Sequence, residues 1–416
     1  MMTNDSERDL DIVVWGASGF TGRLVAAYLF ERYGAGGELR WAMAGRNKAK
    51  LEEIRAELGS DASEIPILIG DSGDSDSLAV IARSTSVVCA TVGPFARYGS
   101  EMVAACARHG THYCDITGEV QWMRRMIDSY EEDAHESGAR IVHTCGFDSI
   151  PSDLGCFYVN RAMWERHGVP CKEVRLAVRK MRGAFSGGTI ASMLNALEES
   201  KQDPDARRAL GHPYGLNPAG TQSGEDGPDQ KSPRWDEDFG SWTAPFVMAS
   251  VNTRVVRRSN VLMEYAYGDN FRYSESTLTG KGPAGWAKAT SMTTAMAAFL
   301  AAASFGPSRK MLNKMFLPQP GEGPNREQRE KGCFELIILG KHPQDHKLDI
   351  RARVTGDKDP GYGATCRMLG ESAVCLALDR DRLAVPGGFW TPASAMGDLL
   401  LKRLRRDAGM TFEMMD

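Results

Sequence analysis

The sequence has no paired cysteines, and this argues against two kinds of stabilised site. Its 9 cysteines are scattered singly, their number is odd, and none belongs to a Cys-x-x-Cys pair. A disulfide framework or a structural zinc site needs paired or regular spacings. The scattered thiols instead indicate reduced cysteines in a cytosol-like compartment. We therefore expect a cytoplasmic protein without a metal site.

The sequence also lacks an excess of positive charge. Its 50 Lys and Arg residues stand against 54 Asp and Glu residues, which gives a formal net charge of -4. A nucleic-acid-binding protein presents a basic field to the phosphates. We therefore expect no nucleic acid among its partners, and a local basic run at residues 402–406 is typical of the solvated face of a last helix.

Long hydrophobic runs are scarce as well. The residues up to Leu10 are polar and acidic, so the sequence predicts no secretory signal. Residues 284–305 are rich in Ala, Met and Thr, and Lys288 is their single charge. They approach the ~20 apolar residues of a membrane span, but their hydroxyl side chains and shortage of Leu and Ile favour a buried or surface-lying helix. Weak contact with a membrane or lipid through this segment stays open as the alternative, and so does a homodimer.

The sequence does contain an apolar strand followed by three glycines. Residues 12–15 form an unbroken apolar run, typical of a strand buried on both faces of a parallel sheet. The glycines that follow would allow a tight turn, close approach of a pyrophosphate, and close packing of the next helix. Hydroxyl groups and the free N–H groups of a helix start also favour phosphate. The predicted phosphate-binding residues are Gly16, Ser18, Gly19, Phe20, Thr21 and Gly22; an ordinary strand-to-helix turn is the alternative for this motif alone.

An arginine follows the second predicted strand, residues 39–44. NAD-preferring folds usually place an acid at this position for the ribose 2′-hydroxyl, whereas an arginine can pair with a 2′-phosphate. Arg46 therefore favours NADP, and its alternative is a solvated residue at a helix start. Asn47, beside it, is a predicted cofactor contact and a candidate cap for a helix that ends at Leu58.

Four more predicted strands, at 65–70, 86–91, 112–115 and 141–144, alternate with helices. In an open α/β sheet the ligand lies at the carboxyl ends of the strands. Asp71, after the third strand, is therefore an adenine-side candidate or a helix cap. The loop after the fourth strand contributes nicotinamide-side candidates, or is a rigid Gly-Pro turn; its residues are Val92, Gly93 and Pro94. The loop after the sixth strand turns Asp148 and Ser149 toward a ligand.

The pattern changes after about residue 171. Alternating strands at 173–180, 271–279, 332–341 and 347–355 predict an antiparallel sheet with helices near 188–200 and 284–305. Residues 211–245 are irregular, typical of a functional lid or a mobile loop. The basic run 254–258 is interpreted as a solvated strand end, with contact to substrate phosphates as the alternative.

The predicted fold class is α/β, with a Rossmann-type doubly wound parallel sheet and a second α+β domain whose sheet is mainly antiparallel. Residues 1–165 form the dinucleotide-binding domain and residues 166–359 the substrate or interaction domain. Helices within 360–416 are expected to return to the first domain, which would place Tyr362 near the cleft between the two.

Seven stretches spread over nearly the whole chain resemble one known family, the saccharopine dehydrogenase-like NADP oxidoreductases, and within it the trans-acting enoyl reductases of lipid biosynthesis. They are GASGFTG at 16–22, AGR at 44–46, TVGPFARYG at 91–99, DITGE at 115–119, CGFDSIPSD at 145–153, DPGYGAT at 359–365 and TPASAMGD at 391–398. Ser149 and Ile150 stand where true saccharopine reductases have Pro-Gly, a departure that argues against an amino-acid substrate.

The resemblance implies an NADP(H)-dependent oxidoreductase that reduces an enoyl double bond in a long-chain lipid or polyketide-type intermediate, either free or carrier-bound. From their loop positions, Tyr98, Ser149 and Tyr362 are candidate hydrogen donors, and Asp148 could orient one of them. The short-chain dehydrogenase pattern Tyr-x-x-x-Lys is absent from the expected place. One alternative is a dehydrogenase of a C–N bond, with a carboxylate clamp drawn from Arg97, Arg179 and Arg182. The other is a non-catalytic NADP-binding sensor or scaffold.

Overall fold

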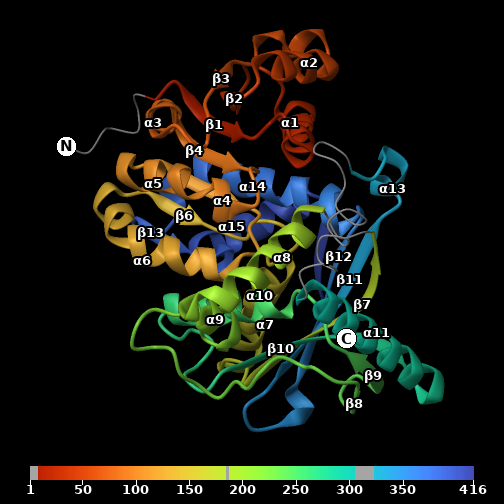
Figure 1. The fold of residues 1–416 in the computed structure, drawn as a ribbon. Helices are drawn as coiled ribbons and strands as arrows, with labels where there is room; N and C mark the ends of the chain where they lie inside the picture. Colours follow the sequence, from red (N-terminus) through yellow and green to blue (C-terminus); the bar gives the residue numbers. More distant parts are fainter. Residues whose placement is uncertain (1–7, 184–186, 305–322) are drawn as a thin grey trace.

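The first lobe is built on a seven-stranded sheet in which every pair of neighbouring strands is parallel (Figure 1). The computed structural model describes residues 8–183, 187–304 and 323–416. The strand order is β13-β6-β5-β4-β1-β2-β3. The strands are β1 (Leu10–Trp15), β2 (Trp41–Gly45), β3 (Ile67–Ile69), β4 (Thr85–Ala90), β5 (His112–Asp115), β6 (Arg140–Val142) and β13 (Gly388–Trp390). This order is that of a dinucleotide-binding fold, and its direction reverses between β1 and β4.

Helices cover both faces of this sheet, as its almost wholly buried strands require. Five of them follow the strands in sequence: α1 (Phe20–Tyr33), α2 (Lys48–Leu58), α3 (Ser75–Ser84), α5 (Ser100–His109) and α6 (Val120–Ser137). Another, α14 (Thr365–Leu378), comes from far along the chain and packs on α1, β1, β4 and β5. The C-terminal part of the chain thus completes the first lobe.

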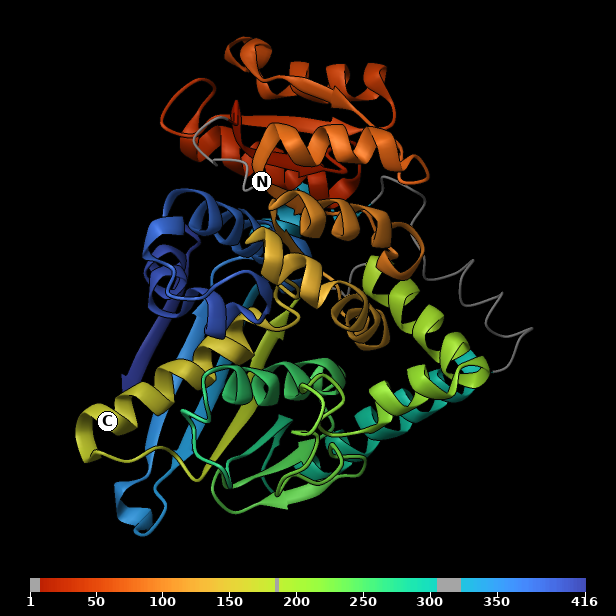
Figure 2. The same ribbon diagram turned by 90° about the vertical axis from the view of Figure 1, so that its left-hand side faces the viewer.

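The second lobe is a mixed seven-stranded sheet in the order β14-β12-β11-β7-β10-β9-β8. Its strands are β7 (Glu173–Arg182), β8 (Arg234–Asp236), β9 (Ser241–Ala244), β10 (Arg272–Gly280), β11 (Cys333–Lys341), β12 (Ile350–Gly356) and β14 (Met410–Met415). Only the β7 and β10 pair is parallel, and the others are antiparallel. Figure 2 shows the first sheet with its helices above this second sheet.

Three helices join the lobes. These are α7 (Ile150–His167), α10 (Ala249–Leu262) and α15 (Pro392–Asp407). α7 packs on β11 and β12, α10 packs on β10, and α15 packs on α7 and α14. One hydrophobic core therefore runs through both lobes, from Val13 in the first sheet to Ile338 in the second.

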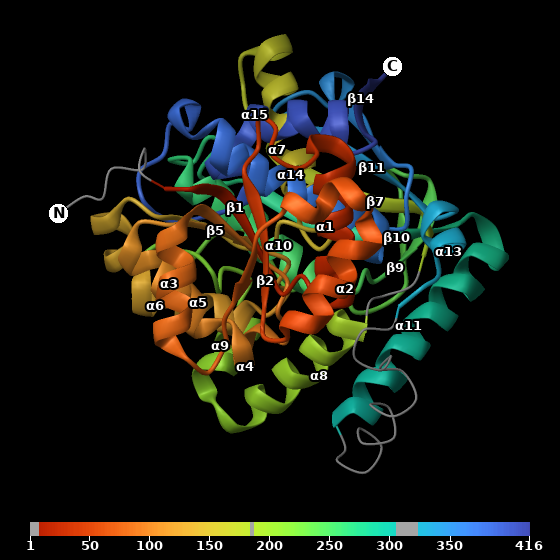
Figure 3. The same ribbon diagram turned by 90° about the horizontal axis from the view of Figure 1, so that it is seen from above.

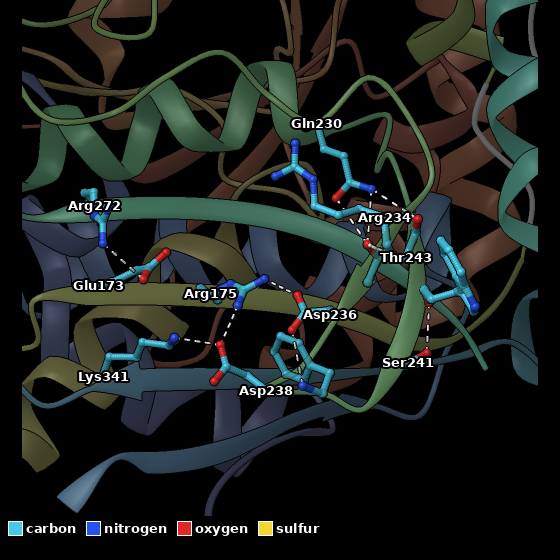
Figure 4. Close-up of polar contacts among 12 residues, drawn as sticks. Glu173, Arg175, Gln230, Arg234, Asp236, Asp238, Ser241, Thr243, Arg272 and Lys341 are labelled. Atoms are coloured by element: carbon cyan, nitrogen blue, oxygen red, sulfur yellow. Dashed lines mark hydrogen bonds and ion pairs between the residues drawn. The ribbon is translucent and has the colours of Figure 1, made fainter. Parts of the chain in front are cut away.

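The outer face of the second sheet carries a cluster of charges (Figure 4). Arg175 on β7 pairs with Asp236 and Asp238 of the β8–β9 hairpin, and the Lys341 Nζ lies 2.6 Å from an Asp238 carboxylate oxygen. These ion pairs fasten a short edge hairpin to the middle of the sheet.

The remaining described helices are α4 (Phe95–Tyr98), α8 (Gly187–Gln202), α9 (Pro204–Gly211), α11 (Gly282–Ser304) and α13 (Arg326–Glu330). α11 contains the segment predicted at 284–305, whose last residue lies outside the described ranges. It is a surface helix that projects from the body (Figure 3), and Trp286 on it is 50% exposed. Among the described helices, none is both long and apolar enough to cross a bilayer.

The predicted fold class is confirmed, but the interpretation of residues 254–258 as a strand end is wrong. They lie in α10, where Arg254, Arg257 and Arg258 are each about 4% exposed or less. Arg254 pairs with Asp229, Arg257 lies 2.7 Å from Asp226, and Arg258 donates to the Phe389 carbonyl at 2.7 Å. Buried charges need such partners. The irregular segment 212–233 supplies both acids and is thereby packed onto α10.

Candidate functional site

The glycine turn follows β1 at the point where the strand order reverses. Gly16 has a φ of +90°, in the region that favours glycine, and its carbonyl accepts the Gly19 N–H at 2.9 Å. A Cβ at Gly22 would lie 2.2 Å from the Gly16 carbonyl oxygen, and one at Gly16 would lie 2.6 Å from Val92 Cγ2. The turn is therefore closed tightly enough to admit only glycine, and it leaves the first N–H groups of α1 without a side-chain cap. That arrangement fits a pyrophosphate.

Thr91 stabilises this turn and was not among the predicted site residues. Its Oγ1 lies 3.1 Å from the Trp15 carbonyl and 3.3 Å from the Gly16 carbonyl, and the side chain also borders the pocket described below. Because Thr91 follows β4 directly, it joins the two strands on either side of the reversal. Its position at the start of the TVGPFARYG stretch was the one indication available in the sequence.

Arg46 and Asn47 stand at the carboxyl end of β2. Arg46 is exposed, and the Asn47 Oδ1 caps α2 by accepting the Lys50 N–H at 3.0 Å, so the predicted cap is confirmed. A Cβ at Gly45 would lie 3.4 Å from Ser18 Oγ, which brings Ser18 to the same edge. Ser18 in the glycine turn and the exposed Arg46, directly after β2, thus lie at the edge of the sheet where dinucleotide-binding folds receive the adenosine ribose.

Asp71 follows β3 and does not cap the next helix. Its Oδ1 accepts the Gly73 N–H at 2.9 Å, whereas Asp74 Oδ1 accepts the Asp76 N–H at the start of α3. The cap alternative for Asp71 is therefore wrong, because the chain makes a further turn before the helix begins.

The loop after β4 lies beside a pocket of about 480 Å³. Gly93 and Pro94 line it, while Val92 packs against the core. Phe95 and Ala96 then begin α4, and both of their N–H groups donate to Glu119, at 2.7 and 3.1 Å. Glu119 was not predicted as a site residue.

The pocket is enclosed by the glycine turn, the loops after β4, β5 and β6, the start of α14, and helices α8 and α10. Its described lining is largely apolar. Several methionines and aliphatic residues form the side toward the second lobe: Met181, Met193, Ala196, Leu210, Val247, Met248 and Val251. Among the described lining residues, Asp148 is the only carboxylate, and there is no Lys, Arg or His.

Two of the four predicted catalytic residues border this lining: Tyr362, a predicted hydrogen donor, and Asp148, which was predicted to orient a donor. Burial, helped by the charge of Asp115, raises the pKa of Asp148 to about 7. Tyr362 is 5% exposed, its ring packs edge-on against Phe20 at 4.8 Å, and its hydroxyl accepts the Gly187 N–H at 3.2 Å. A carboxyl group that holds a proton near neutral pH and a tyrosine hydroxyl therefore border one pocket.

The other two predicted catalytic residues, Tyr98 and Ser149, lie outside the described lining. Tyr98 is 44% exposed on α4, and Ser149 is fully buried with its Oγ 3.0 Å from Asn252 Oδ1. Of the three arginines considered as a carboxylate clamp, Arg97 reaches Asn195, Arg179 pairs with Glu335, and none borders the pocket.

An open parallel sheet with a closed glycine turn at its reversal point, and a pocket beside that turn, is the arrangement of a dinucleotide-binding protein. Comparisons with known proteins narrow the class. The family model described as the saccharopine dehydrogenase NADP binding domain matches residues 12–142. A protein of Mycobacterium tuberculosis assigned to the trans-acting enoyl reductases is 42% identical, with 95% of this chain and 96% of that protein covered. The trans-acting enoyl reductase of Mycobacterium bovis is 39% identical, with 96% of both chains covered.

The chain therefore belongs to the trans-acting enoyl reductase family of saccharopine dehydrogenase-like oxidoreductases, and it is an NADP-dependent oxidoreductase. Among solved structures, saccharopine dehydrogenase (L-Glu forming) from Saccharomyces cerevisiae has the same fold, with a TM-score of 0.51 at 11% identity over 98% of this chain and 100% of that one. The resemblance drawn from the sequence is confirmed.

Proposed function

We propose that the protein uses NADPH in preference to NADH and reduces the enoyl double bond of an acyl thioester with a long apolar chain, of lipid or polyketide type. The observation that carries this proposal is the pocket, which adjoins the glycine turn, is lined mainly by apolar side chains, and holds one carboxyl group. An uncharged acyl chain can be buried there without leaving a charge unpaired.

Three parts of the first lobe fit the cofactor. We assign the pyrophosphate to the glycine turn and the 2′-phosphate to Arg46. The nicotinamide ring is assigned to the Gly93-Pro94 loop, because this loop lies next to the turn and lines the pocket. When bound, NADPH supplies the hydride that the β-carbon of the substrate accepts.

Asp148 is assigned the proton that the α-carbon accepts in the same reduction. With a pKa of about 7, its carboxyl group carries a proton in a large fraction of molecules at neutral pH, and it faces the pocket. A general acid works best when its pKa lies near the operating pH. After the proton has left, Asp148 regains one from solvent.

The Tyr362 hydroxyl is assigned to the thioester carbonyl, on which negative charge develops during the reduction. Asp359 holds the turn that carries Tyr362, because its carboxylate accepts the Tyr362 and Gly363 N–H groups at 3.2 and 2.7 Å. Tyr98 and Ser149 have no part in this proposal, because neither borders the pocket.

The pocket disfavours the dehydrogenation of a C–N bond in an amino acid. A substrate with free carboxylates needs cationic partners in a buried site, and the described lining offers none. The departure from Pro-Gly at Ser149 and Ile150 points in the same direction.

A panel of substrates tests the proposal. NADPH oxidation would be followed with 2-enoyl thioesters of increasing chain length and, in parallel, with pairs of an amino acid and an aldehyde. We expect turnover of the enoyl thioesters, rising with chain length, and none of the pairs. Turnover of the pairs alone would contradict the proposal, and tight NADPH binding without any turnover would favour the sensor or scaffold alternative.

A further inference from the structure

The buried carboxylate of Glu119 connects two walls of the pocket. Glu119 is fully buried, and its Oε1 and Oε2 accept the Phe95 and Ala96 N–H groups on one side. On the other side Oε1 accepts the Ser192 hydroxyl at 2.8 Å. We propose that Glu119 is a positioning residue that couples cofactor binding at the Gly93-Pro94 loop to closure of α8 over the pocket. This inference rests on the cofactor site proposed above.

The carboxylate is itself held rigidly from behind. The Glu119 N–H donates to Thr117 Oγ1 at 3.1 Å, and the Thr117 N–H donates to Asp115 Oδ1 at 3.0 Å, so the whole stretch after β5 is locked to the sheet. When the Phe95 and Ala96 amides move, the Glu119 carboxylate therefore reorients with them, while the backbone of Glu119 stays in place.

α8 is a cover whose apolar cluster is separate from the main core. In this helix only Gly187, Leu194 and Ala196 are buried. Leu194 belongs to a small cluster with Ala303 of α11 that is separate from the main core. Ile190 and Leu197 of α8, with Phe299 and Ala302 of α11, pack against this cluster. The packing joins α8 to α11 rather than to the main core, so polar contacts help to hold α8 over the pocket.

Two of the polar contacts of α8 are at least partly exposed to water. Asn195 Oδ1 accepts a hydrogen bond from Arg97 Nε at 3.3 Å in an exposed position, and Glu199 accepts one from the Gln121 amide at 3.1 Å in a partly buried position. Exposed contacts of this kind contribute little. Gly187 and Ser192 differ because both line the pocket and their partners, the Tyr362 hydroxyl and the Glu119 carboxylate, are buried.

The pocket lining includes Gly93, Pro94 and Phe95 at one end of this connection and Ser192 at the other. A ligand that orders the loop fixes the two amides, which orient the carboxylate toward the Ser192 hydroxyl. Closure of α8 follows, and it excludes water from the acyl chain. Without the ligand, the carboxylate is less well oriented toward the Ser192 hydroxyl, and α8 opens to admit a bulky substrate.

Hydrogen exchange of the α8 amides, with and without NADPH, tests the coupling. The variants are Ser192→Ala, which removes the hydroxyl, and Ser192→Thr, which keeps it. Ser200→Ala is the matched control on the same helix, because the Ser200 hydroxyl bonds only within α8, to the Leu197 carbonyl. NADPH affinity is measured separately for each protein.

In the wild type, Ser192→Thr and Ser200→Ala, NADPH should slow α8 exchange. In Ser192→Ala about tenfold of that protection should be lost, since one hydrogen bond to a charged group is removed, and NADPH affinity should fall by no more than the same factor, because coupling between binding and closure is reciprocal. Glu119→Gln should lose the protection of α8 and also bind NADPH more weakly, because the amide nitrogen of the new side chain cannot accept an N–H. Full protection in Ser192→Ala, or α8 exchange that NADPH leaves unchanged in the wild type, would overturn the proposal. A protein that shows the coupling but does not reduce enoyl thioesters would contradict the proposed function alone.

Discussion

Replacing Gly22 with alanine should weaken NADPH binding because the new methyl group cannot fit. Its Cβ would lie 2.2 Å from the Gly16 carbonyl oxygen and 2.7 Å from Thr91 Oγ1, both of which belong to the closed turn. Ordinary contacts of carbon begin at about 3.5 Å, so α1 has to move away by roughly 1 Å. The overpacking should cost about 1–3 kcal/mol of folding free energy. The displaced N–H groups should lose at least one hydrogen bond to phosphate, which corresponds to about 10- to 100-fold in affinity.

The assay is a titration of NADPH followed by nicotinamide fluorescence, with thermal unfolding measured on the same samples. Gly227→Ala is the matched control, because a Cβ at Gly227 would meet nothing within 4 Å. It should bind NADPH as the wild type does. The reasoning would be refuted if Gly22→Ala folded and bound NADPH with unchanged affinity, since the pyrophosphate would then lie elsewhere.

Three further predictions concern charged groups. Arg46→Ala should reduce the preference for NADPH over NADH about tenfold; an equal loss for both cofactors in binding titrations would contradict the 2′-phosphate assignment. Asp148→Asn should slow turnover about 10²- to 10⁴-fold at unchanged NADPH affinity, and the wild-type rate should fall as the pH rises through about 7, where Asp148 loses its proton; a flat pH profile would argue against this donor. Burial raises the pKa of Glu275 from 4.5 to about 7, so the folded state holds a proton that the unfolded state releases, and stability should fall as the pH rises across that window. In urea unfolding, Glu275→Gln should remove about 3 kcal/mol of this pH-dependent loss in unfolding free energy. The same loss in both proteins would show that Glu275 is ionised throughout.

Six strands of the parallel sheet could be predicted from the sequence because most of them contain a short apolar run that ends in a polar or glycine-rich loop. Local rules also gave the Asn47 cap. In such places the residues that determine the structure are neighbours in the chain. Strand β13 escaped prediction because three residues, Gly388 to Trp390, become a strand only by pairing with β6.

α10 was missed because its arginines suggested a solvated surface. Arg254, Arg257 and Arg258 follow the i, i+3, i+4 spacing of one helix face, but that face is buried, and its acidic partners come from 25 to 31 residues away. The same limit applies to Glu119, whose partners Phe95 and Ala96 belong to another loop. A sequence shows which groups carry charge, whereas the fold decides which of them meet.

Reduction of a 2-enoyl thioester in deuterated water tests the central claim most directly. The account predicts one solvent deuterium at the α-carbon, where Asp148 delivers an exchangeable proton, and none at the β-carbon. Mass spectrometry of the product with the wild type and Asp148→Asn would show the label forming about 10²- to 10⁴-fold more slowly in the variant. Solvent deuterium at the β-carbon, or the absence of any saturated product, would contradict the assignment of this pocket as an enoyl reductase site.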